Sequence, residues 1–111
     1  MNDRQLLELA AKAAGIEVHD WLPGSLGFAL GQSGKFLKAR WNPLADDGDA
    51  LRLAVRLNLK HVFHPALNQA IVRPYYASDL EWVENVEKHP DPYAATRRAI
   101  VRAAAEIGRA A

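Results

Sequence analysis

Apolar residues follow a helical spacing at the start of this chain. Between residues 6 and 13 they recur three or four positions apart, which places their side chains on one face of a helix. Asn2 or Asp3 can cap the first turn, and Gly15 can end the helix in a left-handed conformation. The pattern predicts a helix over residues 3–14.

Two later regions have the pattern of strands joined by turns. Residues 15–42 hold five of the seven glycines, and "LGFAL" and "KFLKARW" flank "GQSG", which predicts a hairpin. A second hairpin is predicted where "LKHVFH" and "QAIVRPYY" flank "PALN". Pro74 lacks an N–H donor and therefore marks an edge or the end of a strand. The extended segment "LEWVENV" can add one more strand.

Two further helices are expected, at "DDGDALRLAVRLN" and at the C-terminus. The first ends near Asn58, which tolerates a left-handed conformation. In the second, Asp91 caps the helix and Pro92 takes its first position. Its predicted inward face consists of Tyr93, Thr96, Ile100, Ala103, Ala104 and Ile107, with Arg98, Arg102 and Arg109 opposite.

This order of elements predicts an α+β protein. We expect a two-layer or three-layer α/β sandwich, in which a mostly antiparallel sheet of about four to five strands is covered by three helices. Residues 1–111 have the length of a single domain.

Composition excludes several classes of protein. Half of the residues are hydrophobic and the formal net charge is +1, so the chain is neither disordered in composition nor generally attracted to nucleic acid. Without cysteine there is no disulfide framework and no thiolate zinc site. The N-terminus does not resemble a signal peptide, and no apolar run approaches the roughly 18 residues of a membrane span. We therefore expect a cytoplasmic protein without a membrane partner.

Charge is unevenly distributed along the C-terminal third. An acidic segment over residues 79–91 precedes a helix that carries four arginines and one glutamate. Either the two segments lie side by side in the fold, or they form separate surfaces for partners.

Three carboxylates in "DDGD" raise the question of a metal site. Asp46 in the capping position accounts for the first, Asp47 adds a favourable charge near the positive end of the helix, and Asp49 can reach back as in a capping box. The closing Glu of a calcium-binding loop is missing. The stretch therefore predicts the start of a helix, and we expect no bound metal.

Other candidate chemistry is weak. The glycine-rich segment fails the Walker pattern at both ends, and Pro23 stands where a nucleophile elbow needs glycine. His61 and His64 lie three apart on a predicted strand and so face opposite sides. The carboxylates Glu81, Glu84 and Glu87 are interpreted as a solvated acidic face rather than an acid and base pair. We expect no catalytic residue and no cofactor, with an enzyme of unknown type as a remote alternative.

Nucleic-acid binding is the second hypothesis. "KFLKARW" interleaves basic and aromatic residues, as in strands that stack bases. Its candidate contacts are Lys38 and Arg40, together with Arg98 and Arg102 of the C-terminal helix.

Three segments carry a resemblance to a known family. "LLELAAKAAGI", "WNPLADDGDALRLAVRLNL" and "DPYAATRRAIVRAAAEIG" resemble small phage and prophage proteins related to the phage ABA-sandwich domain. The resemblance implies a phage or prophage origin and an α/β/α sandwich. The family has no assigned activity and implies no catalytic residues.

The first hypothesis is therefore a non-enzymatic phage accessory protein that acts through protein contacts, either with a host or phage protein or as a small oligomer. Exposed aromatic residues often anchor such interfaces. The candidates are Trp21, Tyr75, Tyr76 and Trp82. The alternative is that these aromatic residues complete the core of the protein itself.

Overall fold

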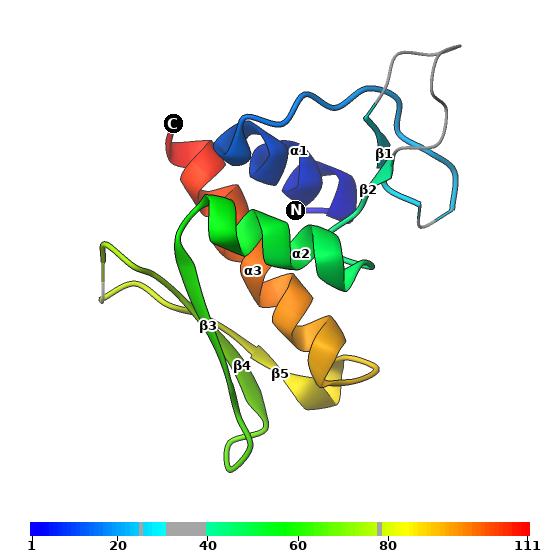
Figure 1. The fold of residues 1–111 in the computed structure, drawn as a ribbon. Helices are drawn as coiled ribbons and strands as arrows, with labels where there is room; N and C mark the ends of the chain where they lie inside the picture. The colour runs from blue at the N-terminus through cyan, green and yellow to red at the C-terminus, as the bar shows by residue number, and fades with distance from the viewer. Residues whose placement is uncertain (25, 31–39, 78) are drawn as a thin grey trace.

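A computed structural model describes residues 1–24, 26–30, 40–77 and 79–111 and has an α+β fold (Figure 1). The described helices and strands are α1 (Asp3–Ala14), β1 (Phe28–Ala29), β2 (Arg40–Trp41), α2 (Asp47–Arg56), β3 (Leu59–His64), β4 (Gln69–Pro74), β5 (Trp82–Asn85), a 3-10 turn (Val86–Lys88) and α3 (Pro92–Ala110).

The predicted α+β class with three helices and antiparallel strands is confirmed, but the described strands do not form one sheet. β1 and β2 make a two-stranded ladder, whereas β3, β4 and β5 form a separate three-stranded sheet in that order. Helix α2 lies between the two sheets in the chain and packs on α3. The turn predicted at "GQSG" lies outside the described residues.

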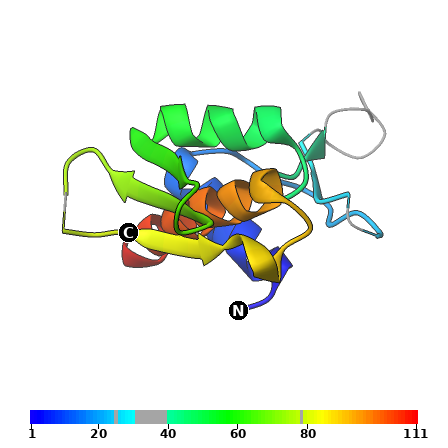
Figure 2. The same cartoon turned by 90° about the horizontal axis from the view of Figure 1, so that it is seen from below.

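Helix α3 runs through the middle of the molecule. It packs against α1 on one side and against the three-stranded sheet and α2 on others (Figures 1 and 2). Alanine makes these close approaches possible because it adds only a methyl group to the helix surface. At Gly108 even that is too much, since a Cβ there would overlap the carbonyl oxygen of Leu9.

The predicted inward face of α3 is therefore too narrow. Val101 and Ala105 are also buried, because a central helix is covered on several sides rather than along one stripe. Tyr93, predicted to face inward, is exposed, because in the first turn of α3 it borders an opening between α2 and β3 that no described side chain fills.

Local capping signals are confirmed at the starts of all three described α-helices. The Asn2 side chain accepts from the Gln5 amide at 2.8 Å, and the Gln5 side chain accepts from the Asn2 amide at 2.9 Å. The Asp46 carboxylate accepts from the Asp49 amide at 2.8 Å, and Asp91 accepts from the Ala94 amide at 2.8 Å.

The capping box proposed for Asp49 is wrong. Its carboxylate accepts from the Asn42 amide at 3.0 Å and pairs with Arg52 at 2.8 Å. The Asp46 amide, which the box would have satisfied, donates instead to the Asn42 carbonyl oxygen at 2.9 Å. A preceding turn thus takes the place that a capping box would fill.

Candidate functional site: an apolar groove beside a strand edge

A groove of about 350 Å³ lies between α2 and β3 and has α3 as its floor. The two walls, α2 and β3, run apart from the connection between them (Figure 1). That connection contains Asn58, whose φ of +53° lies in the left-handed region that asparagine tolerates. The groove is lined by Asp47, Ala50, Leu51, His61, Phe63, Tyr93, Thr96, Arg97 and Ile100.

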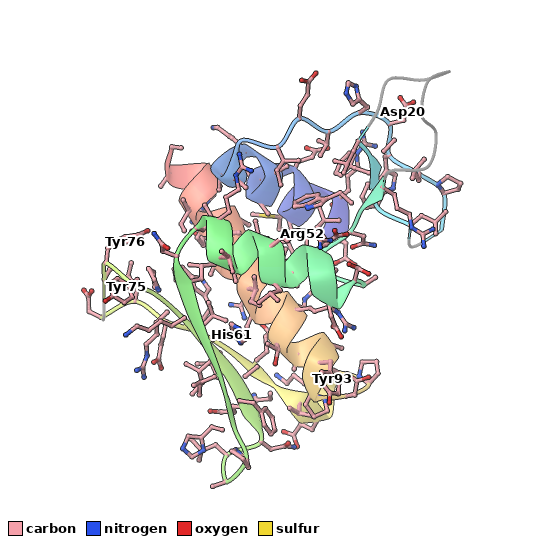
Figure 3. The ribbon with its side chains drawn as sticks, viewed as in Figure 1. Asp20, Arg52, His61, Tyr75, Tyr76 and Tyr93 are labelled. Carbon is pink, nitrogen blue, oxygen red and sulfur yellow. The ribbon has the colours of Figure 1, made fainter. Side chains whose placement is uncertain are left out.

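Alternation along β3 decides which of its side chains enter the groove. Leu59, His61 and Phe63 share the face of the strand that looks toward α3, whereas Lys60, Val62 and His64 face away. His61 and Tyr93 are labelled in Figure 3 and come from β3 and the first turn of α3. The groove thus combines residues that lie more than 30 positions apart in the chain.

The ion pair at the end of the groove compensates the charges of its lining. A guanidinium nitrogen of Arg97 lies 2.6 Å from Asp47 Oδ1, and the Arg97 Nε donates to the Leu44 carbonyl oxygen at 2.9 Å. These bonds fix the N-terminal turn of α2 on α3. Because Asp47 and Arg97 neutralise each other, the rest of the groove presents mainly apolar and aromatic surface.

The β3 strand forms one edge of the three-stranded sheet. Within the described residues it pairs with β4 alone, from Leu59 opposite Pro74 to His64 opposite Gln69. The Tyr75 amide donates to the Asn58 carbonyl oxygen at 2.9 Å, which sets the phase of this antiparallel ladder.

The choice of which β3 residues form hydrogen-bonded pairs with β4 determines which backbone groups face the groove. Residues that bond to the partner strand alternate with residues whose N–H and C=O point away from it. Counting from Asn58, the groups of Lys60, Val62 and His64 point toward β4. The groups of His61 and Phe63 point to the open edge, beside the groove that their side chains line.

The structure separates the four predicted interface aromatics. Trp21 packs edge-on against Phe28 with ring centroids 4.9 Å apart, and Trp82 is half-buried against the core. Both tryptophans therefore contribute to the core, as the alternative interpretation proposed. Tyr75 and Tyr76 are exposed after β4, and Figure 3 shows them away from Tyr93.

The predicted nucleic-acid contacts are dispersed as well. Arg98 pairs with Asp3 at 3.0 Å, and Arg102 pairs with Glu84 and donates to the Val83 carbonyl oxygen at 3.3 Å. Arg40 is exposed on β2, and Lys38 lies outside the described residues. The two α3 arginines therefore already have carboxylate partners.

A partly buried polar cluster joins the acidic segment to the basic helix. Glu84 Oε1 lies 2.8 Å from His89 Nε2, while Glu84 Oε2 pairs with Arg102. The Glu84 and His89 side chains are only 13% and 14% exposed, so interpreting Glu84 as part of a solvated acidic face is wrong. The acidic segment and the basic helix therefore lie side by side here, and Arg102 compensates the half-buried carboxylate on β5.

Burial by itself raises the pKa of Glu84, but the hydrogen bonds and charges of His89 and Arg102 outweigh it and hold that pKa below its ordinary value. A carboxyl group that stays ionised near neutral pH is unsuited to act as a general acid. The cluster therefore fits a structural role, in which it ties β5 and the following turn to α3.

The carboxylates of "DDGD" point to separate partners. Asp46 caps α2, Asp47 pairs with Arg97, and Asp49 bonds to the Asn42 amide and Arg52. Across the described parts of the chain, histidines, aspartates and glutamates form no group of three that is spaced to hold a metal ion.

The groove was not predicted from the sequence, although α2 carries an uncovered apolar face to which the groove residue Leu51 belongs. The buried residues of α2 are Ala50, Leu53 and Ala54, but Leu51 and Val55 are apolar, four positions apart and exposed. A helix with apolar residues on a second face has a surface that its own fold does not cover.

No protein-family model, curated protein or solved structure matches this chain. Among the described helices, none has the length and apolar character needed to cross a membrane.

Proposed function

We propose that this protein is a non-enzymatic binding module that acts through protein contacts, and that the groove between α2, β3 and α3 is its contact site. The observation that carries the proposal is the combination of exposed apolar side chains with a strand edge whose backbone groups face the same groove. Each feature by itself is common on protein surfaces, but together they offer both apolar burial and hydrogen bonding to a partner.

The large apolar side chains around the groove are suited to anchor an interface. Leu51 and Tyr93 are 54% and 68% exposed, so a partner can remove substantial apolar area from water. Aromatic residues contribute strongly to binding when they are desolvated in this way. The free-energy cost of removing water from the nearby charges on binding is low, because Asp47 and Arg97 already compensate each other.

The resemblance to small phage and prophage proteins suggests a setting for this activity. In that setting the protein is an accessory protein in the cytoplasm of a bacterial host, and its partner is a host or phage protein. Nucleic-acid association has less support, because Arg98 and Arg102 are engaged by Asp3 and Glu84.

Affinity capture with matched variants tests this proposal. Tyr93 and Tyr76 are both 68% exposed, but only Tyr93 lines the groove. Tagged wild-type protein and the variants Tyr93→Asp and Tyr76→Asp are incubated with extract of the source cells, and captured proteins are quantified by mass spectrometry. We expect Tyr93→Asp to lose a partner that Tyr76→Asp retains.

A second matched pair guards against an effect peculiar to tyrosine. Leu51 in the groove and Leu67 in the β3–β4 loop are 54% and 58% exposed. Leu51→Arg is expected to lose the same partner, whereas Leu67→Arg keeps it. Equal capture by the groove and control variants, all with unchanged melting temperatures, would contradict the proposed contact site.

A further inference from the structure

We propose that the groove receives an extended segment of the partner, which adds to β3 as an antiparallel strand and alternates apolar with acidic side chains. This inference rests on the proposed function, because it names the kind of partner that the groove binds. Strand addition is a recognised mode of peptide binding, in which backbone hydrogen bonds provide affinity and pockets for alternate side chains provide specificity.

The backbone of β3 sets the hydrogen bonding. The N–H and C=O groups of His61 and Phe63 point to the open edge, so an incoming strand bonds to these two residues. Neighbouring strands lie about 4.8 Å apart, which seats the segment beside β3 in the opening that widens from Asn58 between β3 and α2. The six residues of β3 fit a segment of about the same length.

The groove explains why every second side chain of the segment is apolar. Paired residues on adjacent antiparallel strands project from the same face of the sheet. Partner residues opposite His61 and Phe63 therefore point toward α3, where they meet Leu51, Tyr93 and Ile100. Burial of these alternate side chains fills the groove, whereas the residues between them remain on the outer face.

Charge explains why the intervening residues are acidic. The ionisable side chains of β3 are Lys60, His61 and His64, and no described carboxylate pairs with any of them. Lys60 and His64 lie on the outer face of β3, the face that carries the outward residues of an added strand; Lys60 Nζ lies 5.0 Å from the centre of the exposed Tyr75 ring and keeps its positive charge there. Acidic residues there complement the basic strand, and basic residues oppose it.

The same charges disfavour a second copy of this chain as the occupant. If two copies pair antiparallel along β3 with Val62 opposite Val62, His61 of each copy lies opposite Phe63 of the other, and their free backbone groups can bond. That arrangement sets Lys60 of each copy opposite His64 of the other, so basic side chains meet basic side chains. A foreign segment with alternating acidic residues meets no such opposition.

Synthetic peptides test the inference on the full chain. The probe is the hexapeptide Glu-Val-Glu-Leu-Glu-Val, blocked at both ends, and its binding is measured by isothermal titration calorimetry. The matched form has lysine in place of every glutamate. We expect the acidic probe to bind at least about fivefold more tightly than the basic one, and Lys60→Glu together with His64→Glu to reverse that order.

Backbone methylation of the peptide separates strand addition from simple apolar contact. Methyl groups on the amides of valine and leucine remove the donors that face β3, and we expect this to weaken binding about tenfold or more. Methyl groups on the glutamate amides block donors that face away from β3, so they are expected to leave binding within about threefold. Equal loss from both patterns overturns strand addition.

Three other outcomes overturn the inference. One is no heat of binding for the acidic probe at millimolar concentration. Another is a concentration-dependent dimer in sedimentation that Phe63→Glu abolishes, which assigns the edge to a second copy. The third is capture of a cellular partner that depends on Tyr93 but is not competed by the acidic peptide, which retains the proposed function and removes only strand addition.

Discussion

The Glu84 cluster offers a quantitative test of how the sheet is attached to α3. Glu84→Gln preserves the shape of the side chain but removes the charge that pairs with His89 and Arg102. Breaking a fully buried ion pair costs about 3–5 kcal/mol, and an exposed pair about 0–1. The Arg102 side chain is 42% exposed, which places this pair between those limits, so we expect a loss of about 2 kcal/mol. For a chain of this size that loss lowers the melting temperature by about 8 °C.

The pH dependence of the loss follows from the lowered pKa of Glu84. A carboxyl group whose pKa is lower in the folded state than in the unfolded state binds protons more weakly when folded. Its stabilisation is therefore fully present above the unfolded value and disappears as the pH falls through the folded value. The melting-temperature gap between wild type and Glu84→Gln should be largest near pH 7 and should close below pH 4.5, the ordinary value for this group.

The assay is thermal unfolding followed by circular dichroism over a pH series. Glu87→Gln is the matched control, because Glu87 undergoes the same chemical change on an exposed position of the adjacent turn. We expect this control to stay within about 0.5 kcal/mol of wild type. A Glu84→Gln gap that is constant with pH, or no larger than that of Glu87→Gln, would refute the assignment of the cluster as a structural tie.

Three further predictions address the helices and the surface charge. Asp46→Ala should lower the free energy of unfolding by about 1 kcal/mol because α2 loses its cap, whereas Asp46→Asn should keep most of that stability. Millimolar calcium or magnesium should leave the wild-type melting temperature unchanged, and metal stabilisation that Asp46→Asn abolishes would contradict helix capping. Gly108→Ala should lower the free energy of unfolding by about 1–3 kcal/mol, because the added methyl group meets the Leu9 carbonyl oxygen. Arg109→Ala, on the exposed side of α3, should change it by no more than about 0.5 kcal/mol, and thermal melts that rank the two variants in the reverse order would contradict the close α1–α3 contact. Fluorescence anisotropy at about 0.15 M salt should detect no sub-micromolar binding to duplex DNA, since the net charge is +1 and both Arg98 and Arg102 are paired with carboxylates. Sub-micromolar binding would restore the nucleic-acid hypothesis.

Features that depend on neighbours in sequence were predictable. The start of α2 at "DDGD" and the start of α3 at Asp91 and Pro92 follow from capping within one helical turn. The hairpin of β3 and β4 follows from alternation on both sides of "PALN", with Pro74 at the end of its strand. Each of these signals acts over a few residues and is therefore visible in the sequence.

Features that depend on distant residues were not predictable from these patterns. Whether α3 is covered on one side or several depends on where α1, α2 and the sheet pack, and alanine is compatible with either arrangement. The Asp47–Arg97 pair joins positions 50 residues apart, and the groove exists because that pair and the connection through Asn58 set α2 and β3 at an angle over α3. Local periodicity contains no information about that angle.

Residue-resolved hydrogen exchange by NMR tests the central claim most directly, because it reports the two backbone amides at the open edge. In the free protein we predict fast exchange for the His61 and Phe63 amides and slow exchange for those of Lys60 and Val62, which point toward β4. Saturation with the acidic hexapeptide should slow His61 and Phe63 selectively. Equal protection of all four amides in the free protein, or no change at His61 and Phe63 on saturation, would contradict a binding groove built on the β3 edge.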